Sequence, residues 1–205
     1  MTLHIGICLF PEVEALDFAG PYEVFTTASR VAKRMQPASE SVFSVSAIAS
    51  GMQAVRARAG LQILPDHTFG SHPPVDVLIV PGGVVTAEMH NPEVIEWIAR
   101  TAAQAQMVAS VCTGAFLLAQ AGVITQGPVT THWEDTADLQ TQFPALQVVR
   151  DQRWVDAGRI VTSAGISAGI DMCLHLVERL HSRELAAGTA RQMDYVGQEA
   201  AVRLI

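Results

Sequence analysis

VASVCTGA, residues 108–115, is the stretch that decides the fold, because an apolar strand turns here directly into a helix. Met107–Val111 is short and apolar, as in a strand buried on both faces of a parallel sheet. Residues 113–121 are typical of a helix that Gly122 ends. Cys112 occupies the turn, and such strand-to-helix elbows expose a nucleophile at the edge of the sheet where open α/β folds bind ligands. Position alone leaves a buried structural cysteine as the alternative.

The place of Cys112 beside a helix N-terminus also predicts its reactivity. The helix dipole stabilises a thiolate there, so a lowered pKa is expected for this thiol. The other two cysteines, Cys8 and Cys173, lie within apolar patterns and are expected in the core.

Short apolar runs and helical segments alternate along the whole chain, which predicts a flavodoxin-like, doubly wound α/β fold. Its sheet is expected to be mostly parallel, with helices on both faces. No repeat or linker interrupts the pattern, so residues 1–205 are expected to form a single domain. The predicted strands cover 3–10, 43–49, 75–80, 107–111 and 129–132, with a small β excursion at 54–63 and a hairpin of 154–157 and 159–163. The predicted helices cover 17–33, 91–104, 113–121, 133–142, 166–181 and 182–195.

Composition narrows the classes of partner. The hydrophobic content of 49% against 16% charged residues is slightly apolar and weakly favours an oligomer interface. The net charge is −7 and the 13 Lys and Arg residues are scattered, which argues against nucleic acid. No apolar run is long enough to span a bilayer, and no cysteine or histidine spacing indicates a metal site. Three cysteines without a secretion signal favour the cytoplasm.

Two further motifs follow strands of the predicted sheet. Gly82 and Gly83 come after the strand at 75–80, where they can turn sharply and aim backbone N–H groups at a reacting atom, as in an oxyanion hole. Taken alone, the glycine pair is only a turn signal. Thr130–Trp133 follows a shorter strand, and His132 within it is either a base near the cysteine or a hydrogen-bonded structural residue.

The segment LDFAGPYEVF, residues 16–25, follows the first strand. Asp17 opens a helix there, and capping alone would explain it. The alternative is an acid that accepts a proton from Cys112 or holds a water beside it. Glu23 lies off the face of Asp17 and is expected to be structural. Small residues at 163–169, including Gly165 and the neighbouring Ile166, are expected to line the pocket or a dimer seam.

In their order and combination, these motifs resemble the ThiJ/PfpI superfamily within the class I glutamine amidotransferase-like fold. The resemblance covers nearly the whole chain and implies a homodimer with its nucleophile at Cys112. The chain is most similar to the branch of bacterial isocyanide hydratases, which pairs the cysteine with an aspartate, here Asp17. The peptidase-like branch places a histidine where this chain has Thr113, and the deglycase and glyoxalase branch relies on a glutamate in place of Asp17. The motifs lie at residues 17–25, 81–83, 110–115, 130–133 and 163–166.

That resemblance implies a cysteine-dependent hydro-lyase that hydrates a small-molecule isocyanide to an N-substituted formamide, without a metal or organic cofactor. Cys112 would form a thioimidate with the substrate carbon, and Asp17 would hold a water and move protons. Backbone N–H groups of Gly83 and Thr113 would hold polar atoms of the intermediate. The alternative is a non-catalytic ligand- or redox-sensing protein, related to the sensing domains of AraC-type regulators. These regulators share the signature LDxxGPxEVF with this chain, and they carry a further helix-turn-helix region. This chain is expected to lack that region.

Overall fold

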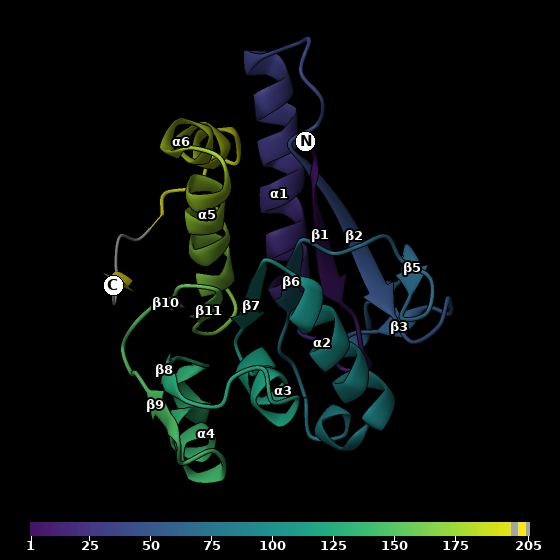
Figure 1. The fold of residues 1–205 in the computed structure, drawn as a ribbon, viewed down its shortest axis with the longest axis vertical. Coiled ribbons are helices and arrows are strands. Elements are labelled where there is room, and N and C mark those ends of the chain that lie inside the picture. The colour runs from purple at the N-terminus through teal and green to yellow at the C-terminus, as the bar shows by residue number, and fades with distance from the viewer. Residues whose placement is uncertain (198–200, 204–205) are drawn as a thin grey trace.

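A mostly parallel sheet of eight strands forms the centre of the computed structural model, which describes residues 1–197 and 201–203 (Figure 1). Only β10 and β11 pair in antiparallel fashion within it. The prediction of a mostly parallel, flavodoxin-like sheet is confirmed. In spatial order the strands are β12 (Ala201–Arg203), β10 (Trp154–Ala157), β11 (Ile160–Ser163), β7 (Met107–Val111), β6 (Val77–Val80), β1 (Leu3–Cys8), β2 (Phe43–Ala49) and β5 (His67–Thr68).

The three central strands, β1, β6 and β7, are buried on both faces, which explains their unbroken apolar sequences. Their register fixes where the loops after them meet. Val80 at the end of β6 lies opposite Ser110 near the end of β7. The glycine turn that follows β6 therefore lies beside the elbow that follows β7.

Helices cover both faces of the sheet, as the sequence predicts (Figure 1). On one side, α1 (Ala15–Met35), α5 (Ala168–Leu180) and α6 (Arg183–Gln192) contact one another. On the other side, α2 (Pro92–Gln104) packs against α3 (Gly114–Gln120). The helix expected at 17–33 begins earlier, at Ala15, and contains Pro21 in its interior.

The region after α3 differs most from the prediction. The strand expected at 129–132 is β8 (Gly127–Val129), which pairs with the unpredicted β9 (Leu146–Val148) in a separate two-stranded sheet. Residues 130–132 are a loop, because the Thr130 N–H bonds to the Thr162 hydroxyl instead of continuing a ladder. The helix expected at 133–142 is a 3-10 turn, Trp133–Asp135, followed by α4 (Thr136–Gln142).

Smaller differences concern short elements and helix ends. The excursion at 54–63 is an antiparallel pair, β3 (Val55–Arg56) and β4 (Gln62–Ile63), around a 3-10 turn. The edge strands β5 and β12 were not predicted, because runs of two or three residues carry no periodic signal. The helix expected from residue 166 begins at Ala168.

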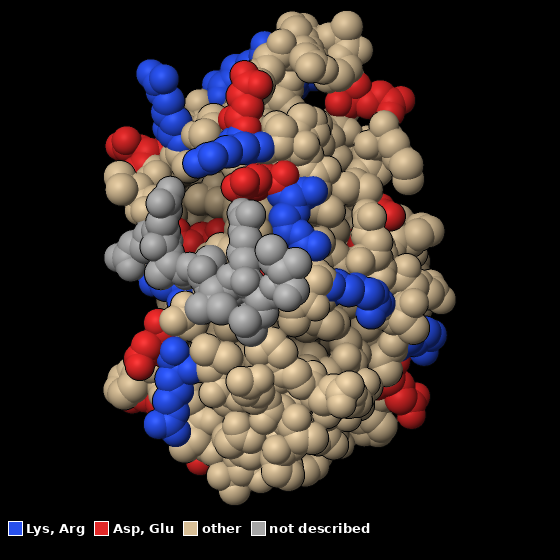
Figure 2. Space-filling model, turned by 60° about the vertical axis from the view of Figure 1, so that its left-hand side comes forward, with Lys and Arg blue, Asp and Glu red and all other residues tan. Residues whose placement is uncertain are grey.

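The surface seen in Figure 2 shows basic and acidic side chains interspersed among other residues, without a stripe of one sign. Among the described residues, no helix has the length and apolar content needed to cross a membrane.

The tightest backbone approach in the sheet gives a test of the fold. A Cβ at Gly114 would lie 2.1 Å from the Val80 carbonyl oxygen, so alanine there forces β6 and α3 apart. Gly114→Ala should lower the free energy of unfolding by about 1–3 kcal/mol or more, the usual cost of overpacking. Gly70→Ala is the matched control, because nothing lies within 4 Å of its added Cβ. Urea unfolding that gives equal stability for both variants would contradict this packing.

Candidate active site

Cys112 turns the chain in a backbone conformation that is rare for residues other than glycine, with φ of 56°. Hydrogen bonds on both sides hold this strained conformation in place. The Cys112 N–H donates to the carbonyl oxygens of Ser163 (3.2 Å) and Ala164 (3.3 Å). The Cys112 carbonyl accepts from the Thr131 hydroxyl at 2.8 Å. The elbow predicted from the sequence is therefore present and is fixed by segments distant in the chain.

Two backbone N–H groups, those of Thr113 and Ile166, hydrogen-bond the sulfur of Cys112 and favour its thiolate. Ile166 itself has a left-handed conformation, with φ of 47°. Of the small-residue segment at 163–169, Ile166 thus contributes a donor to the sulfur.

The glycine turn packs directly onto the elbow. A Cβ at Gly82 would lie 2.6 Å from the Thr113 nitrogen, and Gly83 has φ of 142°. The Gly83 N–H donates to the Thr113 hydroxyl, which donates in turn to the Gly83 carbonyl, both at 2.9 Å. The Gly83 N–H thus has a partner in this structure, and its role as a donor to the reaction intermediate stays a prediction.

Asp17 is the third residue of α1 and is completely buried. It does not cap the helix, whose N-cap position is occupied by Glu14. Its Oδ2 accepts from the Gly82 N–H at 3.1 Å. Its Oδ1 has no N–H or O–H partner among the described residues, and the Cys112 thiol is the donor beside the carboxyl. Glu23, by contrast, is on the surface, where it pairs with Arg30.

Burial dominates the electrostatics of this pair. It raises the pKa of Asp17 to about 7, although the Gly82 N–H opposes the shift. It also raises the pKa of Cys112 to about 12, and the negative charge of Asp17 adds to the rise. The lowered thiol pKa expected from the helix dipole is therefore wrong, because desolvation outweighs the N–H groups that favour the thiolate. Between about pH 7 and about pH 12 the two side chains therefore hold one proton between them.

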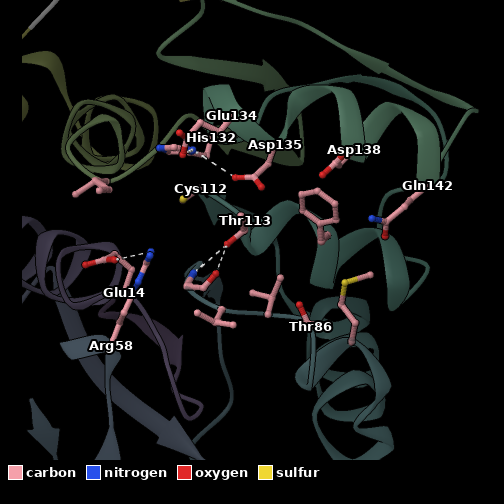
Figure 3. A pocket seen from close by; sticks show the side chains of 16 residues that line it. Glu14, Arg58, Thr86, Cys112, Thr113, His132, Glu134, Asp135, Asp138 and Gln142 are labelled. Atoms are coloured by element: carbon pink, nitrogen blue, oxygen red, sulfur yellow. Dashed lines mark hydrogen bonds and ion pairs between the residues drawn. The ribbon is translucent and has the colours of Figure 1, made fainter. Parts of the chain in front are cut away.

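The thiol lies at a cleft of about 380 Å³ (Figure 3). Asp17 and Gly82 are not on its wall; they lie behind the elbow. Cys8 and Cys173 are completely buried in the core, as predicted. The cleft is lined by Glu14, Arg58, Gly83, Val84, Val85, Thr86, Met89, Cys112, Thr113, Phe116, His132, Glu134, Asp135, Asp138, Gln142 and Ile166.

His132 reaches the same cleft from the loop after β8. Its ring packs on the backbone of Gly165, where an added Cβ would lie 2.1 Å from the ring carbon Cδ2. Its Nδ1 lies 3.3 Å from Asp135 Oδ2 and 3.7 Å from Glu134 Oε2. The structure thus brings together every residue that the sequence singled out for the site, in the cleft or directly behind it.

Sequence reasoning missed most of the cleft wall. The apolar side chains that follow the glycine turn, such as Val85 and Met89, could have been expected from their place at the carboxyl edge of the sheet. The ion pair of Arg58 with Glu14, at 3.5 Å, joins the β3–β4 excursion to the start of α1 and has no local signal. Among the described residues, no group of three or more His, Cys, Asp or Glu side chains is arranged to hold a metal ion.

Comparison with known proteins gives one family. The profile of the DJ-1/PfpI family matches residues 4–179 of the chain. The isonitrile hydratase of Pseudomonas putida is 36% identical over 196 residues, which cover 95% of this chain and 79% of the relative. The transcriptional regulator GbdR of Pseudomonas aeruginosa is 31% identical over 191 residues, 93% of this chain. The chain spans 50% of that regulator's length.

Solved structures agree with this assignment of the fold. A ThiJ/PfpI family protein from Pseudomonas syringae has a TM-score of 0.83 at 26% identity, with 97% of this chain and 77% of that chain covered. DJ-1beta of Drosophila melanogaster has a TM-score of 0.80 at 22% identity, with 96% and 100% covered.

Replacing Asp17 tests the electrostatic coupling at the elbow. Asp17→Asn removes the charge that raises the Cys112 pKa, so the thiol of the variant should titrate below the wild-type value of about 12. The rate of alkylation by iodoacetamide, followed against pH with intact-protein mass spectrometry, measures this pKa. Glu23→Gln removes a carboxylate from the outer face of the same helix and should leave the titration unchanged. An Asp17→Asn thiol that titrates at or above the wild-type pH would show that no such coupling exists.

Proposed function

The chain belongs to the DJ-1/PfpI family, and we propose that it is a cysteine-dependent hydro-lyase converting isocyanides into N-substituted formamides. The observation that carries the proposal is the buried Asp17 carboxyl, which lies beside the Cys112 thiol and behind the cleft that the thiol lines. Such a pair can move a proton between sulfur and substrate without exchanging it with solvent. Identity of 36% to an isonitrile hydratase supports it, since isonitrile and isocyanide are the same functional group.

The first half-reaction adds the thiol across the terminal carbon of the isocyanide. Asp17 takes the proton of Cys112, and the thiolate attacks the carbon, so that a carbon–sulfur bond forms. Asp17 then delivers the same proton to that carbon. The product is a thioimidate, R–N=CH–S–Cys112, and the step consumes no other reactant. The Thr113 and Ile166 N–H groups hold the sulfur while it carries negative charge.

The second half-reaction is hydrolysis of the thioimidate. A water from the cleft adds to the same carbon, and one of its protons passes to the imine nitrogen. The carbon–sulfur bond then breaks as the hydroxyl of the intermediate loses the second proton. The sulfur leaves as a thiolate towards the two N–H groups and regains a proton through Asp17. The substrate leaves as R–NH–CHO, so isocyanide and water balance the formamide, and no metal or organic cofactor takes part in this scheme.

A second candidate function is a ligand- or redox-sensing role without turnover. It is favoured by the 31% identity to the transcriptional regulator GbdR over nearly the whole chain. A sensor would bind an isocyanide or another electrophile at Cys112 and form at most one equivalent of adduct. Multiple turnovers of an aryl isocyanide separate the enzyme from the sensor directly.

Steady-state kinetics with an aryl isocyanide test the role of the pair. Cys112→Ser should have no turnover. Asp17→Asn should be slower by about 10²–10⁴-fold, because it loses general acid–base catalysis. The wild-type rate should fall as the pH drops below about 7, since a protonated Asp17 no longer accepts the thiol proton. Glu23→Gln serves as the folding and assay control. Full activity of Asp17→Asn would remove the basis of the proposal.

The proposed assembly is a cytoplasmic homodimer that acts on a small molecule. Exposed apolar side chains of α1 support an interface there, because Leu16 and Tyr22 remain 38% and 37% exposed. Two-fold dimers are the commonest closed assembly. Light scattering at micromolar concentration should give twice the chain mass of 22.0 kDa. A stable mass equal to one chain would contradict the dimer.

A further inference from the structure

The hydrolytic half-reaction needs a base on the cleft side of the thioimidate carbon, opposite the buried Asp17 that serves the addition step. Asp17 is completely buried and does not line the cleft. The water that attacks the thioimidate arrives from the cleft, on the other side of the elbow. A water becomes an effective nucleophile when a positioned side chain within hydrogen-bond reach takes its proton. That side chain must therefore belong to the cleft wall.

We propose that His132, held by Asp135, is the catalytic base that takes a proton from this water and passes it to the thioimidate nitrogen, an inference that rests on the proposed hydration of isocyanides. Asp135 acts as a positioning residue through His132. Each half-reaction then has its own pair of residues. Asp17 and Cys112 carry out the addition of the thiol to the isocyanide, and His132 and Asp135 promote hydrolysis of the thioimidate.

The orientation of the His132 ring supports this role. Asp135 Oδ2 lies 3.3 Å from Nδ1, so the neutral imidazole keeps its proton on Nδ1 and leaves Nε2 as the free base. The ring edge with Cδ2 and Nε2 lies against Gly165, at 2.1 Å and 3.1 Å from the position of an added Cβ. Gly165 precedes Ile166, whose N–H contacts the Cys112 sulfur. Gly165 therefore links the ring to the segment that contacts the sulfur, and His132 and Cys112 line the same cleft (Figure 3).

Acidic side chains lie near the ring at the cleft. Glu134 and Asp135 come from its own 3-10 turn, and Asp138 comes from α4. Burial and the charges of Asp138 and Glu134 raise the pKa of Asp135, while the interaction with His132 lowers it. Glu14, which also lines the cleft, is paired with Arg58, and Cys112 lines the cleft with Asp17 buried behind it.

A purely structural role makes a different prediction. If the ring only fills the space above Gly165, its loss disturbs the Gly165–Ile166 backbone and hence the sulfur. Formation and hydrolysis of the thioimidate would then slow together. A base acts on hydrolysis alone, so the two half-reactions separate the roles.

Single-turnover kinetics with an aryl isocyanide, combined with intact-protein mass spectrometry, make this separation. His132→Gln should form the thioimidate at the wild-type rate and hydrolyse it about 10²–10⁴-fold more slowly, so that the adduct accumulates on Cys112. Asp135→Asn should slow hydrolysis less and move its acidic limb to lower pH, because the imidazolium loses its carboxylate partner. His181→Gln, the same substitution at an exposed position outside the cleft, should match the wild type in both steps.

Each other outcome overturns the assignment. Equal hydrolysis rates in wild type and His132→Gln would exclude His132 as the base. Equal slowing of both half-reactions would make the ring a brace. Should His132→Gln fail to fold, an unchanged pH profile of hydrolysis in Asp135→Asn would count against the pair. A wild-type protein that forms no thioimidate would refute the proposed hydration itself. If the wild type forms the thioimidate and His132→Gln hydrolyses it at the wild-type rate, only the role of His132 is refuted.

Discussion

The carboxyl group of Asp17 is buried beside the Cys112 thiol, and the surrounding structure serves to hold these two groups together. Desolvation disfavours the charged form of both groups. Asp17 and Cys112 therefore keep their protons to higher pH than an exposed carboxyl and an exposed thiol would. A single N–H, that of Gly82, stabilises the carboxylate form. The β6–β7 register brings that N–H to the elbow, so the position of the acid depends on the pairing of two central strands.

The same constraint explains why two tight backbone approaches meet at one edge of the sheet. Gly82 and Gly114 each leave no room for a side chain against the neighbouring loop. Cys112 and Ile166 adopt left-handed conformations that other contacts must support. Thr131 provides one of these contacts through the Cys112 carbonyl. Strain of this kind persists where the surrounding structure over-determines it, which is common at sites that bind or react.

Much of this arrangement could be predicted from local patterns. The elbow at Cys112, the glycine turn and the buried strands all have signals within a few residues, and the order of the motifs gave the family. The direction in which the thiol pKa shifts could not be predicted, because it depends on burial and on Asp17, which lies far away in the sequence. The cleft wall on α4 was also hidden, since the preceding loop is held by long-range bonds to Thr162 and Cys112.

The central claim is that Asp17 and Cys112 share a proton near neutral pH. Infrared difference spectroscopy, with Asp17→Asn as the reference, follows the protonated carboxyl directly. The account predicts that its carbonyl band is present under mildly acidic conditions and disappears around pH 7, while the thiol titrates only at much higher pH. A carboxyl band that has already vanished near pH 4, as for an exposed aspartate, would contradict the account.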